Sequence, residues 1–283
     1  MGRYRAPLRV DLAGGWTDLA PYTHDHGGEV VNFTIDKWVT ATPDGDGNVD
    51  FQFDVPAGSG LGTSGALNVA KIAALSVDEV SDLDTIAELA FQAEINEGNR
   101  CGRQDQWASA HGGFNRFLFI ADDVEHLPFE PASSAKKWLK KHLIIAHSGI
   151  QHKSGDIQEL VWSRYELGVQ EVFEGLHLIR DAAKKMADGL QRDQRHLVVE
   201  AMNQVTTGVD LLDPSINHPF RSIIEPMISK NLVFAWKALG AGGGGCVALL
   251  CNPSKVSLVD STLSKEGWQV LDWNYENQGL VIA

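Results

Sequence analysis

Cysteine is scarce in this sequence of 283 residues. The three cysteines, Cys101, Cys246 and Cys251, are an odd number and include no CxxC pair. This pattern excludes a disulfide framework. It favours a reducing, cytoplasmic setting, because structural disulfides are typical of oxidising compartments.

Long apolar runs are also missing from the chain. No run approaches the roughly 20 residues of a membrane-spanning helix. The first residues, MGRYRAPLRV, lack the apolar core of a signal peptide, and Ala6 stands where a myristoylation signal has Ser or Thr. The sequence therefore predicts a soluble protein that is neither exported nor anchored to a membrane.

Basic residues are outnumbered by acidic ones. Lys and Arg total 24 against 37 Asp and Glu, which gives a net charge of −13. On average, such a chain repels a nucleic-acid backbone or an anionic membrane surface. We therefore expect neither as a partner, although a local basic pocket for a small anion is compatible with this charge.

Apolar periodicity predicts strands, then helices, then strands again. Residues 29–43 and 49–55 are expected to form a hairpin across a turn at 44–48, and residues 9–14 a further strand. Helices are expected over 64–75, 81–98 and 103–113, and in a helix-rich region over 155–204. Further strands are expected at 142–149, 245–252, 267–273 and 279–283, and a domain boundary near residue 138.

Glycine is concentrated in two stretches. Residues 54–67, DVPAGSGLGTSGAL, precede an apolar helix, and residues 240–245 contain five glycines before an apolar strand. A glycine-rich loop that leads into a helix offers free backbone amides to a phosphate. The spacing excludes both a P-loop, because no Lys follows Gly62 or Gly65, and a dinucleotide fingerprint, because Thr63 replaces its third glycine. Taken alone, the first stretch is also consistent with a flexible loop, but two such stretches indicate backbone that approaches a ligand.

Three stretches, in this order, resemble the motifs of the GHMP kinase family, which transfers the γ-phosphate of ATP to hydroxyls of small molecules. Residues 7–18, PLRVDLAGGWTD, are similar to the first motif. Residues 56–66, PAGSGLGTSGA, are similar to the phosphate-binding second motif, and residues 240–246, GAGGGGC, to the third. Residues 101–115, CGRQDQWASAHGGFN, look most like the members that phosphorylate an anomeric sugar hydroxyl, namely heptose 7-phosphate kinases and L-fucose kinases.

The resemblance implies an α+β fold of two domains. Residues 1–138 would form an ATP-binding, ribosomal-protein-like N-terminal domain, and residues 139–283 a ferredoxin-like C-terminal domain. ATP, Mg²⁺ and the sugar would meet in the cleft between them. The implied reaction converts a sugar or sugar phosphate into a sugar 1-phosphate, as a supply step for nucleotide-sugar synthesis.

The resemblance also assigns roles to charged residues. Asp105 corresponds to the catalytic base, and Arg9 to the basic residue near that base and the transferred phosphate. Ser64 and Glu94 correspond to Mg²⁺ ligands, with Glu97 as the alternative, and their oxygen atoms suit this metal. Without the resemblance, Asp105 would be a helix cap, Arg9 a surface residue of a strand edge, and both glutamates part of a solvated helix face.

The remaining assigned residues surround the phosphates and the sugar. The carboxylate of Asp18 is expected to accept hydrogen bonds from sugar hydroxyls, although it could instead cap the following turn. Residues expected to bind the phosphates are Pro56, Gly58, Ser59, Gly60, Leu61, Gly62, Thr63, Ser64, Gly65, Gly242 and Gly243. Those expected to bind the sugar, besides Asp18, are Thr17, Gly15 and Gly28.

Histidines near two of these stretches are weaker candidates. His24 and His26, with Asp25 between them, could suggest a metal site. No further ligand lies nearby at a suitable spacing, so a loop at the sugar pocket or its rim is the preferred interpretation. His152 or Lys153 is a candidate contact for a phosphate of the substrate.

Two features depart from the family pattern. The segment between Thr42 and Val55 is short, so part of the wall around the adenine is expected to be trimmed, and the nucleotide preference stays open. Gly65 stands where relatives have Ser or Ala, which is expected to loosen the first turn of the helix.

Two other functions stay open. A GHMP-type kinase for a non-sugar alcohol, such as mevalonate, would have an apolar pocket and would not need Asp18. A non-catalytic sensor of sugars or nucleotides would not need Asp105. The sequence determines neither the acceptor sugar nor the oligomeric state, for which a homodimer is one candidate.

Overall fold

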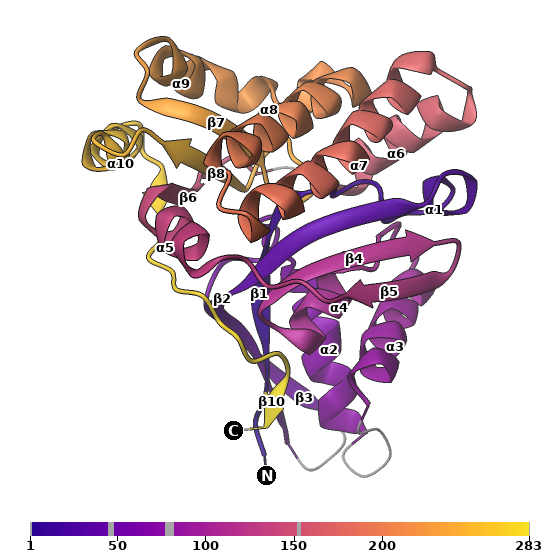
Figure 1. Cartoon of the computed structure of the whole chain (residues 1–283). Helices are drawn as coiled ribbons and strands as arrows, with labels where there is room; N and C mark the ends of the chain where they lie inside the picture. Colours follow the sequence, from indigo (N-terminus) through magenta and orange to yellow (C-terminus); the bar gives the residue numbers. More distant parts are fainter. Residues whose placement is uncertain (1, 45–47, 77–81, 152–153, 283) are drawn as a thin grey trace.

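The computed structural model describes residues 2–44, 48–76, 82–151 and 154–282. Its strands form two antiparallel sheets, and helices pack around both of them (Figure 1). The predicted α+β class is therefore confirmed.

The first sheet comes mainly from the first half of the chain. Its strands are β1 (Tyr4–Ala13), β2 (Gly28–Pro43), β3 (Val49–Phe53), β4 (Phe114–Ile120), β5 (Asp123–Leu127) and β10 (Val281–Ile282). They lie in the order β10-β1-β2-β4-β5, and β3 pairs with β2. Pro43 lies opposite Val49, which confirms the predicted hairpin, whereas residues 45–47 of its turn lie outside the described residues.

Four helices accompany the first sheet: α1 (Tyr22–Asp25), α2 (Thr63–Leu75), α3 (Leu83–Asn96) and α4 (Gln104–His111). Helix α2 packs on β1 and β2, while α3 and α4 pack on α2 and on each other. Asp82 caps α3 because its carboxylate accepts the amide N–H of Thr85 at 3.0 Å. Gly112, with a φ of +71°, ends α4. Helices α2, α3 and α4 confirm the three helices expected in this region.

The second sheet belongs to the second half of the chain. Its strands are β6 (Leu143–His147), β7 (Val233–Ala238), β8 (Cys246–Cys251) and β9 (Gln269–Val270), in the order β7-β8-β6-β9. Its helices are α5 (Ser133–His142), α6 (Ser154–Glu166), α7 (Gln170–Gln191), α8 (Arg195–Leu212), α9 (His218–Ser229) and α10 (Val256–Lys265), with a 3₁₀ turn at Pro214–Ile216. Residue 138, near which a boundary was expected, lies within α5, through which the chain passes between the sheets. Strand β10 then returns to the first sheet.

Helices α7 and α8 connect the two halves. Helix α7 packs against β1 and β2, whereas α8 packs against β7 and also contacts β1 (Figure 1). In the parts of the chain that the structure describes, no helix combines the length and apolar character that crossing a membrane requires.

Strand β8 shows why a continuous apolar run becomes a central strand. Successive side chains of a strand point to opposite faces of the sheet. Cys246, Ala248 and Leu250 therefore join the large core that reaches the first sheet. Val247 and Leu249 join a second core, beneath α9 and α10. Both faces are buried, so apolar residues are required at every position of the strand.

One buried ion pair joins the two sheets. The ammonium of Lys237, on β7, lies 2.5 Å from Oδ2 of Asp11, on β1, and donates to the carbonyl oxygen of Asp11 at 2.9 Å. Both side chains are about 95% buried, at 4% and 5% exposure. Burial lowers the pKa of Lys237, and the Asp11 charge opposes that shift. The pair therefore depends on both partners being present.

We expect Lys237→Met to destabilise the fold. The substitution leaves the Asp11 carboxylate buried without its cation, which costs about 3–5 kcal/mol of unfolding free energy. Urea unfolding should show this loss as a lower midpoint. The double variant Asp11→Ala with Lys237→Met should recover part of the loss, because no unpaired charge remains. Additive losses in the double variant would contradict this account of the pair.

Candidate active site

One cavity of about 300 Å³ brings together most of the charged residues singled out from the sequence. It lies where the loop between β3 and α2 meets the glycine run between β7 and β8. The predicted site residues that line it are Arg9, Asp18, Gly58, Gly60, Gly62, Thr63, Ser64, Glu94 and Asp105. The site therefore draws on β1, α2, α3 and α4, together with residues from the second half of the chain.

The start of α2 forms one wall of the cavity. Gly62 precedes the helix with a φ of +74°, a conformation that favours glycine. Thr63 and Ser64 follow in the first turn, which contains no acidic side chain. The first amides of a helix lack partners within the helix and lie at the positive end of its dipole. This wall is therefore suited to a phosphate.

The two glycine stretches are in direct contact. A side chain at Gly60 would place its Cβ only 2.4 Å from the carbonyl oxygen of Leu239, and a Cβ at Gly240 would lie 2.8 Å from Cα of Gly60. The amide N–H of Cys246 also donates to the carbonyl oxygen of Ser59 at 2.8 Å. The two loops are thus held backbone to backbone, which only residues without side chains permit at these positions.

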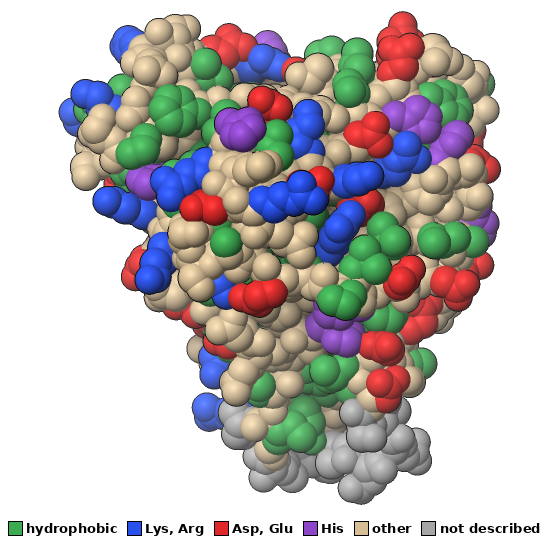
Figure 2. All heavy atoms as spheres, in the orientation of Figure 1, with side chains coloured by type: hydrophobic (Ala, Val, Ile, Leu, Met, Phe, Trp, Pro, Cys, Tyr) green, Lys and Arg blue, Asp and Glu red, His purple; other side chains and the backbone are tan. Residues whose placement is uncertain are grey.

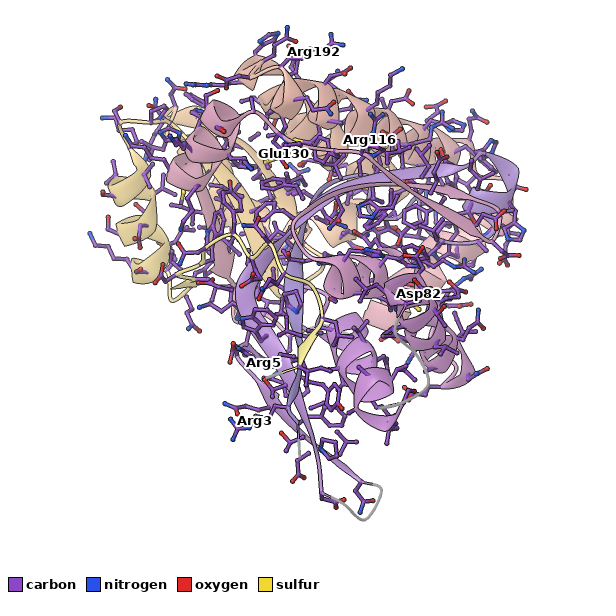
Figure 3. The ribbon with its side chains drawn as sticks, turned by 60° about the horizontal axis from the view of Figure 1, so that its bottom comes forward. Arg3, Arg5, Asp82, Arg116, Glu130 and Arg192 are labelled. Carbon is purple, nitrogen blue, oxygen red and sulfur yellow. The ribbon has the colours of Figure 1, made fainter. Side chains whose placement is uncertain are left out.

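Arg9 joins the loop before α2, residues 54–62, to Asp105. We call this loop the phosphate loop, because the helix start that it leads into is suited to a phosphate. Its Nε donates to Oδ1 of Asp105 at 2.7 Å, and its Nη1 donates to the carbonyl oxygen of Gly60 at 2.6 Å. The Arg9 side chain is 3% exposed and that of Asp105 is 27% exposed. Arg5, on the same strand, instead lies over the ring of Trp38 and projects away from the chain's interior (Figure 3). Arg9 is therefore a buried, oriented cation and not a surface residue.

Gly65 allows Asp105 to approach α2. A Cβ at residue 65 would lie 2.6 Å from Cβ of Asp105 and 3.0 Å from the backbone nitrogen of Gln106. Helix α4 can therefore place its first turn against the first turn of α2. This contact gives a physical reason for the glycine where relatives were expected to carry Ser or Ala.

Asp18 lies under the first turn of α4. Its Oδ2 accepts the backbone N–H of Gln104 at 3.1 Å, and its Oδ1 accepts the side-chain amide of Gln104 at 3.4 Å. Burial raises the pKa of Asp18 to about 7, against the effect of the Gln104 amide, and the charges of Asp105 and Asp11 add to the rise. Asp18 thus caps α4 and also faces the cavity.

Ser64 and Glu94 form an oxygen pair in the cavity. The Ser64 hydroxyl donates to Oε1 of Glu94 at 2.5 Å, and the Gln106 side chain donates to Oε2 at 2.7 Å. Burial raises the pKa of Glu94, and these hydrogen bonds partly oppose the rise. Glu97 instead lies 3.8 Å from Lys71 and is 54% exposed. Glu94, and not Glu97, therefore lies beside Ser64 in the cavity.

Several residues assigned to the sugar lie behind the cavity wall. Thr17 donates to the carbonyl oxygen of Gly14 at 2.7 Å and accepts the amide of Glu29 at 3.2 Å, so its side chain closes a turn. Gly28 packs against this turn, since a Cβ added at residue 28 would lie 1.9 Å from the carbonyl oxygen of Thr17. A Cβ added at residue 15 would lie 2.2 Å from Oδ2 of Asp11. These residues shape the loop that carries Asp18.

Some of the residues expected to bind the phosphates also lack direct access to the cavity. Pro56, Ser59, Leu61 and Gly65 are absent from its described lining, as are Gly242 and Gly243. The amide N–H of Gly243 donates to the carbonyl oxygen of Ile216, and Gly242 packs on the same residue. Gly240 and Ala241 line the cavity in their place. The reason is that the glycine run turns away toward the 3₁₀ helix after Ala241.

The histidine candidates lie elsewhere. His24 pairs with Asp122 at 3.2 Å, and His26 packs against the rings of Tyr22 and His177. Neither lines the cavity. In the described ranges, no group of three His, Cys, Asp or Glu side chains is arranged to hold a metal ion. The other candidates, His152 and Lys153, lie outside the described residues.

The cavity also contains residues that the sequence interpretation missed: Trp16, Leu19, Asn99, Arg100, Cys101, Gly102, Gln104, Gly155, Gln158, Gly240 and Ala241. Those at positions 99–104 directly precede Asp105 in the chain, and this nearness in sequence could have indicated that they line the cavity. Gln158 lies on α6, where the sequence shows only a helical segment. The nearest residues that the sequence singled out, His152 and Lys153, precede this helix.

A second cavity, of about 440 Å³, lies beside α5 and has a different character. Its described lining contains four lysines and two aromatic rings but no carboxylate: Phe114, Ser133, Lys136, Lys137, Lys140, Lys141, Tyr275 and Asn277. Figure 2 shows basic side chains gathered on this face of the molecule, over α5 and α7. The first cavity is therefore the candidate active site, because it combines a carboxylate, a buried cation and a glycine-rich loop at the start of a helix.

Known proteins resemble this chain in sequence and in fold. Residues 30–113 match the family model described as GHMP kinases N terminal domain. A D-glycero-alpha-D-manno-heptose 7-phosphate kinase of Campylobacter jejuni is 26% identical, and the alignment covers 98% of this chain and 97% of that protein. A mevalonate kinase of Pyrococcus abyssi is 25% identical over 83% of this chain and 68% of its own length.

The fold has solved counterparts of nearly the same extent. One is described as a "D-glycero-D-manno-heptose 1-phosphate kinase from Bacteriodes thetaiotaomicron", with a TM-score of 0.80 at 19% identity. The match covers 100% of this chain and 99% of that one. Residues 30–113 are therefore similar to a GHMP kinase N-terminal domain, and the chain as a whole has the fold of solved kinases.

The raised pKa of Asp18 predicts a pH-dependent stability. Between the unfolded value of 3.8 and the folded value of about 7, the folded protein holds a proton that the unfolded chain has lost. The contribution of Asp18 to the free energy of unfolding is therefore fully present below about pH 4, and it is lost as the pH rises toward 7. Asp18→Asn has no charge to bury, so we expect its unfolding free energy, relative to wild type, to be higher at about pH 8 than at about pH 4. Urea unfolding at both pH values measures this difference, and a pH-independent difference would contradict it.

Proposed function

We propose that this kinase transfers the γ-phosphate of ATP to the anomeric hydroxyl of a sugar or sugar phosphate. Acceptors of the heptose 7-phosphate and L-fucose types are the leading candidates. The observation that carries the proposal is the contact between Arg9 and Asp105 directly beside the phosphate loop, with Asp18 at the same cavity. This arrangement supplies a base, a cation and an acceptor of sugar hydroxyl protons within one site.

The reaction follows from these positions. Asp105 takes the proton of the anomeric hydroxyl, and the hydroxyl oxygen forms a bond to the γ-phosphorus. The bond between that phosphorus and the oxygen bridging to the β-phosphate breaks, and ADP leaves with the electron pair. Arg9 fixes the Asp105 carboxylate and supplies positive charge beside the transferred group. Free amides at the start of α2 bind the phosphates.

Ser64 and Glu94 are the residues that would hold Mg²⁺. The observation that supports this is their paired oxygen atoms at the phosphate loop, a donor set that suits a metal binding through few protein oxygens, phosphates and waters. When bound, the metal would neutralise charge on the phosphates. The hydroxyl of Ser64 must then turn from Glu94 toward the metal, and the carboxylate of Glu94 must be ionised.

A sugar acceptor is favoured over a mevalonate-type alcohol by two observations. The lining of the cavity includes the polar side chains of Asp18 and Gln104, which can hydrogen-bond to sugar hydroxyls. The heptose 7-phosphate kinase relative also aligns over nearly its entire length, whereas the mevalonate kinase relative aligns over 68% of its own. The mevalonate-type function remains the alternative, together with a sensor that has lost activity.

We also propose a cytoplasmic location and a division of the chain into two domains near α5. The location rests on the three cysteines, all of which are free. The division rests on the change of sheet between β5 and β6.

A substrate screen with Asp105→Asn tests the proposal. Heptose 7-phosphate, L-fucose, D-galactose and mevalonate are incubated with ATP and Mg²⁺, and ADP release is measured. We expect a sugar or sugar phosphate to be used, and Asp105→Asn to lower kcat by about 10²–10⁴-fold while ADP still binds. Asp260→Asn, on exposed α10, is the matched control and should be fully active. Turnover of mevalonate alone would support the alternative, and an active Asp105→Asn would remove Asp105 from the mechanism.

The metal assignment predicts a change in Mg²⁺ dependence. We expect Ser64→Ala and Glu94→Gln to raise the free Mg²⁺ needed for half-maximal rate by about 10-fold or more. The first removes a hydroxyl ligand, and the second replaces an anionic carboxylate with a neutral amide. Glu97→Gln should leave this concentration unchanged, since Glu97 pairs with Lys71 at the surface. A shift caused by Glu97→Gln, with none from Glu94→Gln, would reverse the assignment.

A further inference from the structure

The described lining of the active-site cavity contains more acidic than basic residues. Of its described lining residues, three are carboxylates, Asp18, Glu94 and Asp105, and two are basic, Arg9 and Arg100. Arg9 is already engaged by Asp105 and the Gly60 carbonyl oxygen. A sugar phosphate that enters beside ATP would bring a further dianion into this acidic site. Among the described lining residues, Arg100 is the basic one left to meet it.

Arg100 is held where an anion could replace its present partner. It lies in the loop between α3 and α4, and its Nη2 donates to Oε1 of Glu166 at 2.9 Å. Its guanidinium also lies 5.5 Å from the ring centre of Trp162, which is fully buried. The Arg100 and Glu166 side chains are 35% and 59% exposed, and such an exposed ion pair contributes about 0–1 kcal/mol. A phosphate dianion can therefore displace Glu166 at little cost, while Trp162 keeps the guanidinium in place.

Gln158 provides a second, independent sign of a ligand on this side. It lies on α6, one helical turn before Trp162, and lines the cavity. Its Oε1 atom is buried and has no hydrogen-bond partner among the described residues. A buried acceptor without a donor is costly, so a turn of this side chain toward a sugar hydroxyl in the cavity would gain a hydrogen bond. Gln158 and Arg100 thus complement a sugar hydroxyl and a nearby phosphate.

We infer that Arg100 binds the phosphomonoester of the acceptor, so that this enzyme uses a sugar phosphate in preference to the free sugar. The inference rests on the proposed function and names its substrate class. The guanidinium offers two parallel N–H donors to phosphate oxygens, which suits this group better than a point charge. Arg100 is thus a specificity-determining residue at the substrate end of the cavity, away from the reacting atoms.

Kinetics with a matched pair of substrates test this inference. KM and kcat are measured for D-glycero-D-manno-heptose 7-phosphate and for the same heptose without phosphate. Wild type should prefer heptose 7-phosphate to the free heptose. Arg100→Ala should raise the KM for heptose 7-phosphate by about 10- to 100-fold with little change in kcat. The KM for the free heptose should not change. Arg100→Lys should recover part of the effect, and Glu166→Gln should lower the KM for the phosphate because the competing carboxylate is gone.

Arg192→Ala is the matched control. Arg192 ends α7 at the outer surface, where it pairs with Asp188 at 3.8 Å and is 68% exposed (Figure 3). Its loss should change neither KM. An unchanged KM in Arg100→Ala, an equal rise for both heptoses, or a wild-type preference for the free heptose would overturn the inference. Unfolding midpoints of the variants separate a loss of fold from a loss of the contact.

A binding measurement distinguishes failure of this inference from failure of the proposed function. Calorimetric titration of heptose 7-phosphate into Asp105→Asn, with and without Arg100→Ala, requires no turnover. Binding that is weakened about 10-fold or more by Arg100→Ala supports the inference even if no heptose is phosphorylated, in which case the proposed function fails alone. Equal affinity of the two proteins, or no binding to either, overturns the inference.

Discussion

The side chain of Arg9 is the contact on which the active site depends. One guanidinium binds both the Asp105 carboxylate and the Gly60 carbonyl oxygen, so it fixes α4 and the phosphate loop relative to β1. The backbone of Arg9 adds a further bond, since its N–H donates to the carbonyl oxygen of Leu61 at 3.1 Å. The proposed base, the loop proposed to bind the phosphates and a cation are thereby brought together in the structure without substrate. Such preorganisation lowers the barrier more than binding alone can.

Close backbone contacts make this arrangement possible. Gly60 and Gly240 bring the two glycine loops together, and Gly65 lets α2 meet α4 at Asp105. The buried pair of Lys237 and Asp11 then ties the second sheet to the first beside the same loops. The glycines and the ion pair thus serve one purpose, which is to hold residues from distant parts of the chain around one cavity.

The sequence predicted those parts of the site that depend on local chemistry. Glycine density located both loops, and apolar periodicity located the helices that carry Glu94 and Asp105. It did not predict the pair of Lys237 with Asp11, because neither periodicity nor charge pattern indicates which distant strands meet. It also placed Thr17 with the sugar, whereas Thr17 closes a turn behind the wall. A neighbour of a binding residue need not face the ligand, and only the folded chain shows which way each side chain points.

The central claim is that Asp105 and the phosphate loop direct phosphate to an anomeric hydroxyl. Phosphorus NMR of the product formed from ATP and the accepted sugar tests this most directly. The account predicts a new phosphomonoester whose phosphorus is coupled to the anomeric proton, formed in equal amount with ADP. Coupling to a proton at any other position, or ADP formation that does not depend on the sugar, would contradict it.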